Sequence, residues 1–219
     1  MINLYNEDCL EAMKRMKDGK YDLAIVDPPY GIGFDGDKFN EAHQKPCATW
    51  KNRTPKNYTQ KDWDRERPSK QYFDELLRVS KKQIIWGANY FTDLLPVSGG
   101  WCIWSKGVPE TMSLSMGEMA WISHTNSVKI KEFLWAGYKK CEQVDRIHPT
   151  QKPAKLYRWL LSMYAKDGDT ILDTHLGSGS IAIACHDMGY SLDGYELDVD
   201  YFQAASKRLS QHQRQLKLF

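Results

Sequence analysis

Asp27, Pro28, Pro29 and Tyr30 are the residues of this sequence whose types and order are best suited to chemistry. They follow the apolar run Leu23–Val26, which is typical of a buried strand. Proline fixes φ and has no backbone N–H, so two consecutive prolines make a stiff corner whose carbonyl oxygens meet no competing donor. With the Asp27 carboxylate and the flat ring of Tyr30, this corner suits a planar ligand that carries an exocyclic amine, such as a nucleobase. An ordinary strand-to-loop turn is the alternative, because Asp and Pro are common turn residues.

A second candidate site is formed by residues 173–180 together with Glu196. Asp173 ends a predicted strand, a glycine-bearing loop opens a predicted helix, and Glu196 ends the next strand about 20 residues later, which is the spacing of a nucleoside-binding βαβ unit. The full G-x-G-x-x-G pattern is absent, and Asp173 would repel a phosphate but attract an α-amino group. The pattern therefore favours an amino-acid-bearing nucleoside such as S-adenosylmethionine over NAD. A tight turn between strand and helix is the alternative.

The segment His148-Pro149-Thr150-Gln151-Lys152-Pro153 is a third candidate. Lys152 can pair with a ligand carboxylate, and Thr150 can donate a hydrogen bond. An ordinary helix start is the alternative, because proline is favoured at the first helical position. The histidines of the chain show no metal-ligand spacing, so no metal site is expected.

The composition is that of an ordinary globular protein. The chain has 219 residues, of which 42% are hydrophobic and 26% charged, with a net charge of +2. This balance neither requires nor excludes a nucleic-acid partner. The five cysteines form no C-x-x-C pair, so neither a disulfide framework nor a zinc knuckle is expected. No signal-like N-terminus and no bilayer-spanning apolar run is present, and we expect no membrane association and a cytoplasmic location, in a prokaryotic cell or a phage-infected host.

The elements that must position the three candidates alternate between strand and helix along most of the chain. Such alternation predicts a mostly parallel sheet covered on both faces, with ligands at the carboxyl ends of its strands. Asp8, Ser69 and Asp198 are predicted to begin helices as N-caps. Residues 118–122 and 131–135 are predicted to form two further strands, paired antiparallel at the edge of the sheet.

Residues 31–68 follow the Asp-Pro-Pro-Tyr corner and show little periodicity. Basic residues alternate there with Trp50, Tyr58 and Trp63, a combination that suits a nucleic-acid strand through phosphate contacts and stacking. We expect a mobile loop that faces the substrate, and a solvated flexible loop is the alternative.

The three candidate segments and Glu196 resemble, in this order, the motifs of DNA methyltransferases that use S-adenosylmethionine to methylate exocyclic amines. The catalytic motif precedes the cofactor motif, which is the β-type arrangement, and the similarity is particularly close to small prokaryotic and phage adenine-N6 enzymes. The resemblance covers most of the chain and is weakest from Phe34 to Tyr58. It implies one α/β domain over residues 1–219 with a Rossmann-like methyltransferase fold. That fold has a seven-stranded, mostly parallel sheet with one antiparallel strand and helices on both faces.

The resemblance also implies a role for each motif residue. The catalytic motif consists of Asp27, Pro28, Pro29 and Tyr30. Asp27 and the Pro28 carbonyl would accept hydrogen bonds from the target amine, and Tyr30 would stack on a base extruded from duplex DNA. The methyl group would pass directly from sulfonium to nitrogen, without a covalent intermediate. The residues implied to contact the cofactor are Asp8 and Cys9 near its adenine, Glu196 at its ribose, Asp173, Leu176, Gly177, Ser178 and Gly179 along its methionine part, Thr150 and Lys152 at its carboxylate, and Asp27.

The chain departs from its larger relatives in one region. They carry a sizeable target-recognition region before the His-Pro-Thr motif, whereas here only a reduced insert, residues 123–147, is available. We expect sequence reading to be minimal, to be supplied by the loop 31–68, or to be shared across a homodimer.

Three other functions are weighed against adenine-N6 methylation. Cytosine-N4 methylation uses the same acceptors, and Asp27 favours adenine because Ser is frequent at this position in cytosine enzymes. A non-catalytic nucleic-acid-binding subunit with this fold would be expected to lose some of Asp27, Tyr30 and Glu196. A nicotinamide oxidoreductase is disfavoured by Asp173 and the incomplete glycine pattern.

Overall fold

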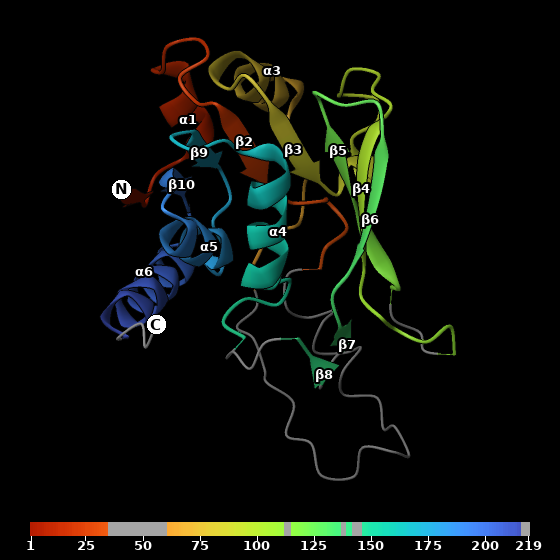
Figure 1. Cartoon of the computed structure of the whole chain (residues 1–219). Coiled ribbons are helices and arrows are strands. Elements are labelled where there is room, and N and C mark those ends of the chain that lie inside the picture. The colour runs from red at the N-terminus through yellow and green to blue at the C-terminus, as the bar shows by residue number, and fades with distance from the viewer. Residues whose placement is uncertain (35–60, 112–114, 137–138, 142–145, 216–219) are drawn as a thin grey trace.

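An eight-stranded sheet organises the chain (Figure 1). The computed structural model describes residues 1–34, 61–111, 115–136, 139–141 and 146–215, so residues 35–60 of the predicted loop and parts of the insert 123–147 lie outside the described residues. The strand order is β1 (Ile2–Tyr5), β10 (Ser191–Tyr195), β9 (Thr170–Asp173), β2 (Leu23–Val26), β3 (Gln83–Trp86), β5 (Gly117–Ile122), β4 (Gly100–Ser105) and β6 (Val128–Glu132). A separate two-stranded ribbon pairs β7 (Trp135–Ala136) with β8 (Lys139–Lys140).

The prediction of a mostly parallel sheet with one antiparallel strand is confirmed, but the number of strands is eight rather than seven. Strand β5 is antiparallel to both of its neighbours, β3 and β4. The predicted antiparallel edge pair is wrong, because β4 lies between β5 and β6 and pairs with both. The edge strand β6 runs parallel to β4, with Trp101 opposite Val128, and it starts three residues earlier than predicted.

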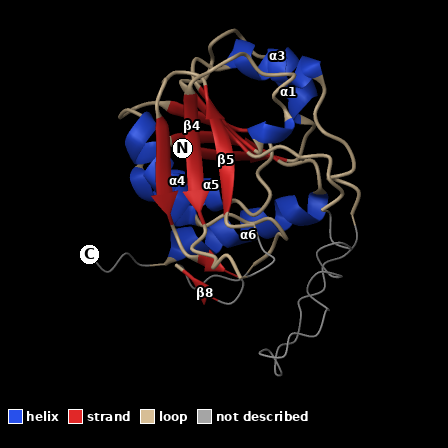
Figure 2. Ribbon diagram, turned by 90° about the vertical axis from the view of Figure 1, so that its right-hand side faces the viewer, coloured by secondary structure: helices blue, strands red, loops and turns tan. Residues whose placement is uncertain are grey.

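Helices cover both faces of the sheet, as predicted. Helices α1 (Cys9–Lys14) and α3 (Lys70–Val79) pack on one face, where Met13, Phe73 and Leu76 are fully buried. Helices α4 (Ala154–Tyr164), α5 (Ser180–Met188) and α6 (Val199–Arg214) pack on the other, around Leu160 and Ala184. Figure 2 shows the strands between these two groups of helices. The buried apolar side chains on both faces hold the strand ends in fixed positions.

The predicted N-caps are confirmed. The Asp8 carboxylate accepts from the backbone N–H groups of Leu10 and Glu11, at 2.8 and 3.0 Å. The side chains of Ser69 and Asp198 cap α3 and α6 in the same way. Such side chains satisfy the backbone donors that a helix leaves without partners at its start. Along the described residues, no helix combines the length and the apolar character that crossing a bilayer requires.

The topology brings the ends of three strands, two of them parallel and one antiparallel, to one edge of the sheet. Asp27 follows β2 and Asp173 ends β9, so both lie at the carboxyl ends of parallel strands. Because β5 runs the opposite way, its first residues lie at the same edge, with Glu118 opposite Trp104 near the end of β4. The start of β5 therefore reaches the place where ligands bind in open α/β sheets.

Candidate active site

Asp27 is held by two donors from different parts of the chain. Its Oδ1 accepts a hydrogen bond from the Tyr30 hydroxyl at 2.7 Å, and its Oδ2 accepts one from the Lys152 ammonium. The two motifs that the sequence separates by more than 100 residues thus meet at this carboxylate. Burial raises the pKa of Asp27 above its ordinary value, and the positive charge of Lys152 opposes that rise.

Lys152 also forms an ion pair with Glu118, 2.9 Å from its Oε2, and the other oxygen of Glu118 lies 2.6 Å from Lys106. The Lys152 side chain is only 2% exposed. Burial acts to lower its pKa, but Asp27 and Glu118 outweigh that effect and raise the pKa overall. Burial likewise acts to raise the pKa of Glu118, and the two lysines outweigh it and hold the pKa at about 2. Asp27, Lys152, Glu118 and Lys106 therefore form a chain of contacts in which carboxylates and ammonium groups alternate.

Tyr30 is fixed by rings and backbone around it. Its ring stacks on that of Tyr90, with centroids 5.1 Å apart and planes inclined by 17°, and Phe91 meets it edge-on at 6.2 Å. Gly87 has φ +67°, and a Cβ at this position would lie 2.0 Å from the Tyr30 ring. Glycine is required at position 87 both by its φ and by the close approach of Tyr30.

Asp64 holds the backbone that follows the corner. Its carboxylate accepts from the N–H groups of Tyr30, Gly31 and Phe34, at 2.7, 3.0 and 2.7 Å. Asp64 is 2% exposed, and these three bonds satisfy the buried charge. The described end of the predicted loop 31–68 is therefore folded back onto the catalytic corner.

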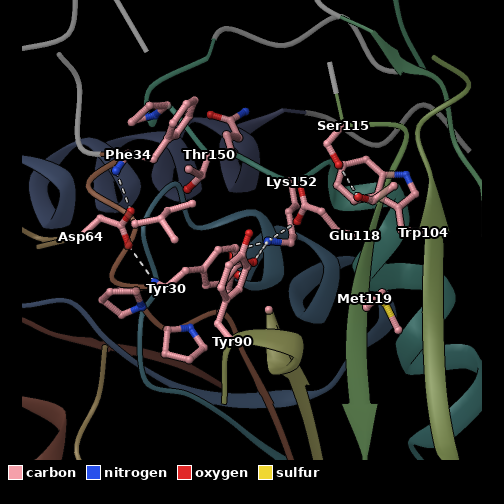
Figure 3. A pocket seen from close by; sticks show the side chains of 18 of the residues that line it. Tyr30, Phe34, Asp64, Tyr90, Trp104, Ser115, Glu118, Met119, Thr150 and Lys152 are labelled. Atoms are coloured by element: carbon pink, nitrogen blue, oxygen red, sulfur yellow. Dashed lines mark hydrogen bonds and ion pairs between the residues drawn. The ribbon is translucent and has the colours of Figure 1, made fainter. Parts of the chain in front are cut away.

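A cavity of about 550 Å³ opens beside these groups (Figure 3). Tyr30 and Tyr90 lie together in its lining, and the side chains of Lys152 and Glu118 lie next to each other there. Three of the residues predicted to contact the cofactor, Asp27, Thr150 and Lys152, line this cavity. Aromatic and apolar side chains, among them Trp104 and Trp135, complete the lining, as is usual for small-molecule sites.

The remaining predicted cofactor residues gather at the ends of β9 and β10. Glu196 accepts from the N–H groups of Gly177 and Asp198, at 2.8 and 2.9 Å, and Asp173 accepts from that of His175 at 3.1 Å. Burial raises the pKa of Glu196. Burial raises the pKa of Asp173 to about 8, and the nearby carboxylates of Asp27 and Glu196 add to the rise.

The other residues of this group have structural contacts as well. Leu176 is buried, and its N–H donates to the Tyr195 carbonyl at 2.8 Å. The Ser178 hydroxyl lies 3.0 Å from that of Ser180, and Gly179 begins α5 with φ +70°. Asp8 caps α1, so one of its oxygens is already engaged. Next to it, burial raises the pKa of Cys9 to about 12, with smaller contributions from Asp8 and Asp173.

His148 lies between the residues around Thr150 and Lys152 and the loop at Gly177. Its ring packs against Trp63 and Tyr201, with centroids 4.9 and 4.3 Å apart, and it lies near Gly177. Burial lowers the pKa of His148 to about 3, so the ring is neutral. The Thr150 hydroxyl lies 3.1 Å from its Nδ1. Within the described residues, no group of three or more His, Cys, Asp or Glu side chains could hold a metal ion.

The sequence did not single out Asp64, Glu118, Lys106 or Tyr90 as site residues. Glu118 carried a weak signal, since it is an acid at the start of the apolar strand Gly117–Ile122. Asp64 lies next to Trp63 in a segment without periodicity, where the sequence gives no element to place it. Glu118 reaches the site because β5 is antiparallel. Asp64 reaches it because the chain folds back onto Tyr30, 34 residues away in sequence.

Comparison with known proteins finds sequences that are similar to this chain. The family model described as DNA methylase matches residues 110–207, which contain the His148 segment, the glycine loop and Glu196 but not Asp27. The Type II methyltransferase M.HpaI of Haemophilus parainfluenzae is 23% identical over 245 residues, which cover 92% of this chain and 72% of that protein.

Two solved structures share the fold. The crystal structure of the M1.HpyAVI–SAM complex matches with a TM-score of 0.57 and 22% identity, covering 95% of this chain and all of that one. The PvuII DNA methyltransferase, described as cytosine-N4-specific, matches with a TM-score of 0.59 and 12% identity, covering 96% and 90% of the two chains. The Rossmann-like methyltransferase fold is thus confirmed. The resemblance predicted from the motifs is confirmed as well: the DNA methylase family model matches part of this chain, and most of the chain is similar in sequence to a Type II methyltransferase.

Proposed function

We propose that this protein transfers a methyl group from S-adenosylmethionine to the exocyclic N6 amine of an adenine that has left the stack of duplex DNA. The observation that carries this proposal is the Asp27 carboxylate at the end of β2, next to the stacked Tyr30 and a cavity of about 550 Å³. A cavity of that size is in the usual range for small-molecule sites. The amine of a base in duplex DNA is not accessible to such a recessed carboxylate, so the base must be extruded first.

The residues at the ends of β9 and β10 fit the cofactor by charge. Asp173 and Glu196 are buried acids whose pKa values are raised, and Asp27 lies close enough to raise the pKa of Asp173 further. A ligand that carries an ammonium and a sulfonium would compensate this negative charge. We therefore assign Asp173 and the turn at Gly177 to the methionine part and Glu196 to the ribose hydroxyls.

The chain's own contribution to the reaction is positioning and electrostatics. When bound, S-adenosylmethionine supplies an electrophilic methyl group. Asp27 and the Pro28 carbonyl accept the hydrogen bonds of the amine, which keeps its lone pair out of conjugation with the ring. Tyr30 provides a stacking face whose orientation is fixed by Gly87 and Tyr90. The Asp27 carboxylate also lies where it can receive the proton that the amine loses.

Incubation with mixed-sequence duplex DNA and methyl-labelled S-adenosylmethionine, followed by nucleoside mass spectrometry, tests this function. Labelled N6-methyladenine is the expected product. Labelled N4-methylcytosine would retain the mechanism and change the base, and absence of any labelled nucleoside with cofactor binding intact would contradict the proposal. Sedimentation in the presence and absence of DNA would test whether a homodimer shares recognition.

A further inference from the structure

The Lys152 ammonium is directed toward protein oxygens. Its Nζ contacts Asp27 Oδ2, lies 2.9 Å from Glu118 Oε2 and 3.3 Å from the Tyr30 hydroxyl. The contacts to Asp27 and Tyr30 are hydrogen bonds, and the contact to Glu118 is an ion pair. At 2% exposure, the side chain has little contact with solvent. This arrangement differs from the role at the cofactor carboxylate that the sequence resemblance implies for Lys152.

Glu118 is itself held from the opposite side. Lys106 Nζ lies 2.6 Å from Glu118 Oε1; Lys106 directly follows β4, and Glu118 lies in the adjacent strand β5, opposite Trp104. A buried ammonium is tolerated when opposite charges and hydrogen bonds surround it, and removal of one partner is costly. The chain of contacts from Asp27 through Lys152 and Glu118 to Lys106 carries two negative and two positive charges when all four groups are ionised, and these charges balance.

Ionisation matters for Asp27 in particular. Burial raises its pKa, the Glu118 charge raises it further, and Lys152, with a smaller contribution from the Tyr30 hydroxyl, lowers it. An ionised carboxylate is purely an acceptor, whereas a protonated one carries a donor on one oxygen. Without Lys152, the carboxyl would tend to protonate and lose part of its capacity to accept the bonds of an amine.

We propose that Lys152 is a positioning residue for methyl transfer, which acts through Asp27 and is held in place by Glu118, and that it does not bind the cofactor carboxylate. This inference rests on the proposed function, because it assigns the target amine to Asp27. It adds Glu118, with Lys106 behind it, to the residues on which the rate depends. Thr150 remains the candidate of the same segment for the cofactor carboxylate.

The test compares Lys152→Met and Glu118→Gln with the wild-type protein. Lys81→Met is the matched control, because Lys81 also pairs with an aspartate, Asp22, but at the distal start of strand β2. Two quantities are measured: the dissociation constant of S-adenosylmethionine by calorimetry, and the single-turnover rate of label transfer to duplex DNA at saturating cofactor. A third readout is independent of activity, namely the titration of the Asp27 carboxyl by ¹³C NMR, assigned with Asp27→Asn.

We expect Lys152→Met to lower the single-turnover rate at least about 100-fold, while the cofactor dissociation constant stays within about threefold of wild type and the pKa of Asp27 rises. Glu118→Gln, which preserves shape, is expected to lower the rate about tenfold with unchanged cofactor binding. Lys81→Met should leave the rate and the dissociation constant unchanged.

A loss of cofactor affinity of tenfold or more in Lys152→Met, with the rate at saturation retained, would overturn the proposal and return Lys152 to the cofactor carboxylate. An unchanged pKa of Asp27 would also overturn it. If the wild-type protein transfers no label, the proposed function fails, and the calorimetric and NMR readouts still decide whether Lys152 acts on Asp27. If Lys152→Met does not fold, Glu118→Gln carries the same decision.

Discussion

The two halves of the site treat their buried carboxylates differently. In the acceptor half, formed by Asp27, Tyr30, Glu118 and Lys152, both acids have a lysine partner. In the cofactor half, formed by Asp173, Gly177 and Glu196, the two acids accept hydrogen bonds from the backbone N–H groups of His175, Gly177 and Asp198. The pKa of Glu118 is accordingly held at about 2, whereas that of Asp173 is raised to about 8.

This difference indicates whether the charges of each half are balanced before or only after a ligand binds. The acceptor half is neutralised by the protein itself, so its geometry is set before any ligand arrives, which is the condition for electrostatic preorganisation. In the cofactor half, burial disfavours the charged forms of Asp173 and Glu196, and a cationic ligand would stabilise them. Changes in the acceptor half should therefore act on the rate, and changes in the cofactor half on affinity.

The largest effect is expected from Asp27→Asn. The amide has nearly the same shape but no charge, so the rate of methyl transfer should fall about 1000-fold, while cofactor affinity changes less than tenfold. Asp22→Asn is the control, because Asp22 flanks the other end of strand β2 and pairs with Lys81 and Thr170. Single-turnover kinetics would measure both variants, and full activity in Asp27→Asn would refute the mechanism.

A second large effect is expected from Gly87→Ala. The added Cβ would lie 2.0 Å from the Tyr30 ring, and φ at this residue is +67°. Gly189→Ala is a matched control, since Gly189 has φ +78° but no atom within 4 Å of an added Cβ. Both variants should lose about 1 kcal/mol of unfolding free energy to backbone strain. Gly87→Ala alone should also lose methyl transfer, about 100-fold if Tyr30 moves by an ångström.

Equal rates in the two alanine variants would show that the position of Tyr30 does not matter for transfer. Chemical denaturation separates the shared strain from this effect, because it reports stability without DNA. The comparison would then locate preorganisation of the acceptor half in Asp27 rather than in the aromatic pair.

The sequence predicted the parts of the site that follow parallel strands. Asp27, Asp173 and Glu196 come at or just after apolar runs, and the rule that ligands bind at carboxyl strand ends applies to them directly. It missed Glu118 because β5 is antiparallel, so its first residues reach that edge. Alternation between strand and helix gave the layers of the fold. It could not give the strand order, because pairing of β4 with both β5 and β6 depends on contacts distant in sequence.

The cofactor half makes a prediction about pH. Burial raises the pKa of Asp173 to about 8 from an ordinary 3.8, so below pH 8 the ligand-free protein holds a proton there that a cationic ligand must displace. The association constant of S-adenosylmethionine should therefore rise between pH 6 and pH 8, by at most about tenfold per pH unit. Asp173→Asn should abolish this rise, and Asp187→Asn, a change in α5 at a carboxylate paired with Arg158, should retain it.

The same pKa gives the sign of a stability effect. The folded protein binds a proton at Asp173 that the unfolded chain has released above pH 4, so this group makes the ligand-free protein less stable as pH rises from about 4 to 8. Asp173→Asn should flatten that decline and raise the unfolding free energy at pH 8, by at most about 5 kcal/mol, since one pKa unit corresponds to about 1.4 kcal/mol. Calorimetric binding and thermal unfolding over this pH range would measure both effects. A binding curve with the same slope in the Asn variant would place the titrating group elsewhere.

The smallest effect is expected from Asp64→Asn, and it tests how far the acceptor half depends on backbone support. The two oxygens of the Asp64 carboxylate accept hydrogen bonds from the backbone N–H groups of Tyr30, Gly31 and Phe34. An amide keeps one acceptor oxygen and places a donor against the remaining N–H, so stability should fall by about 1–2 kcal/mol. Asp62→Asn is the control, because Asp62 is 66% exposed and its pair with Arg65 lies at the surface, where such pairs contribute little.

The kinetic outcome of Asp64→Asn decides what its three bonds do. If they only stabilise the loop, the rate at saturating DNA should match that of Asp62→Asn once both proteins are folded. If they set the direction of Tyr30, the rate should fall severalfold while cofactor affinity is unchanged, as for the other changes in the acceptor half. We expect the second result, because the Tyr30 backbone N–H donates to Asp64 at 2.7 Å and the Tyr30 hydroxyl donates to Asp27 at the same distance.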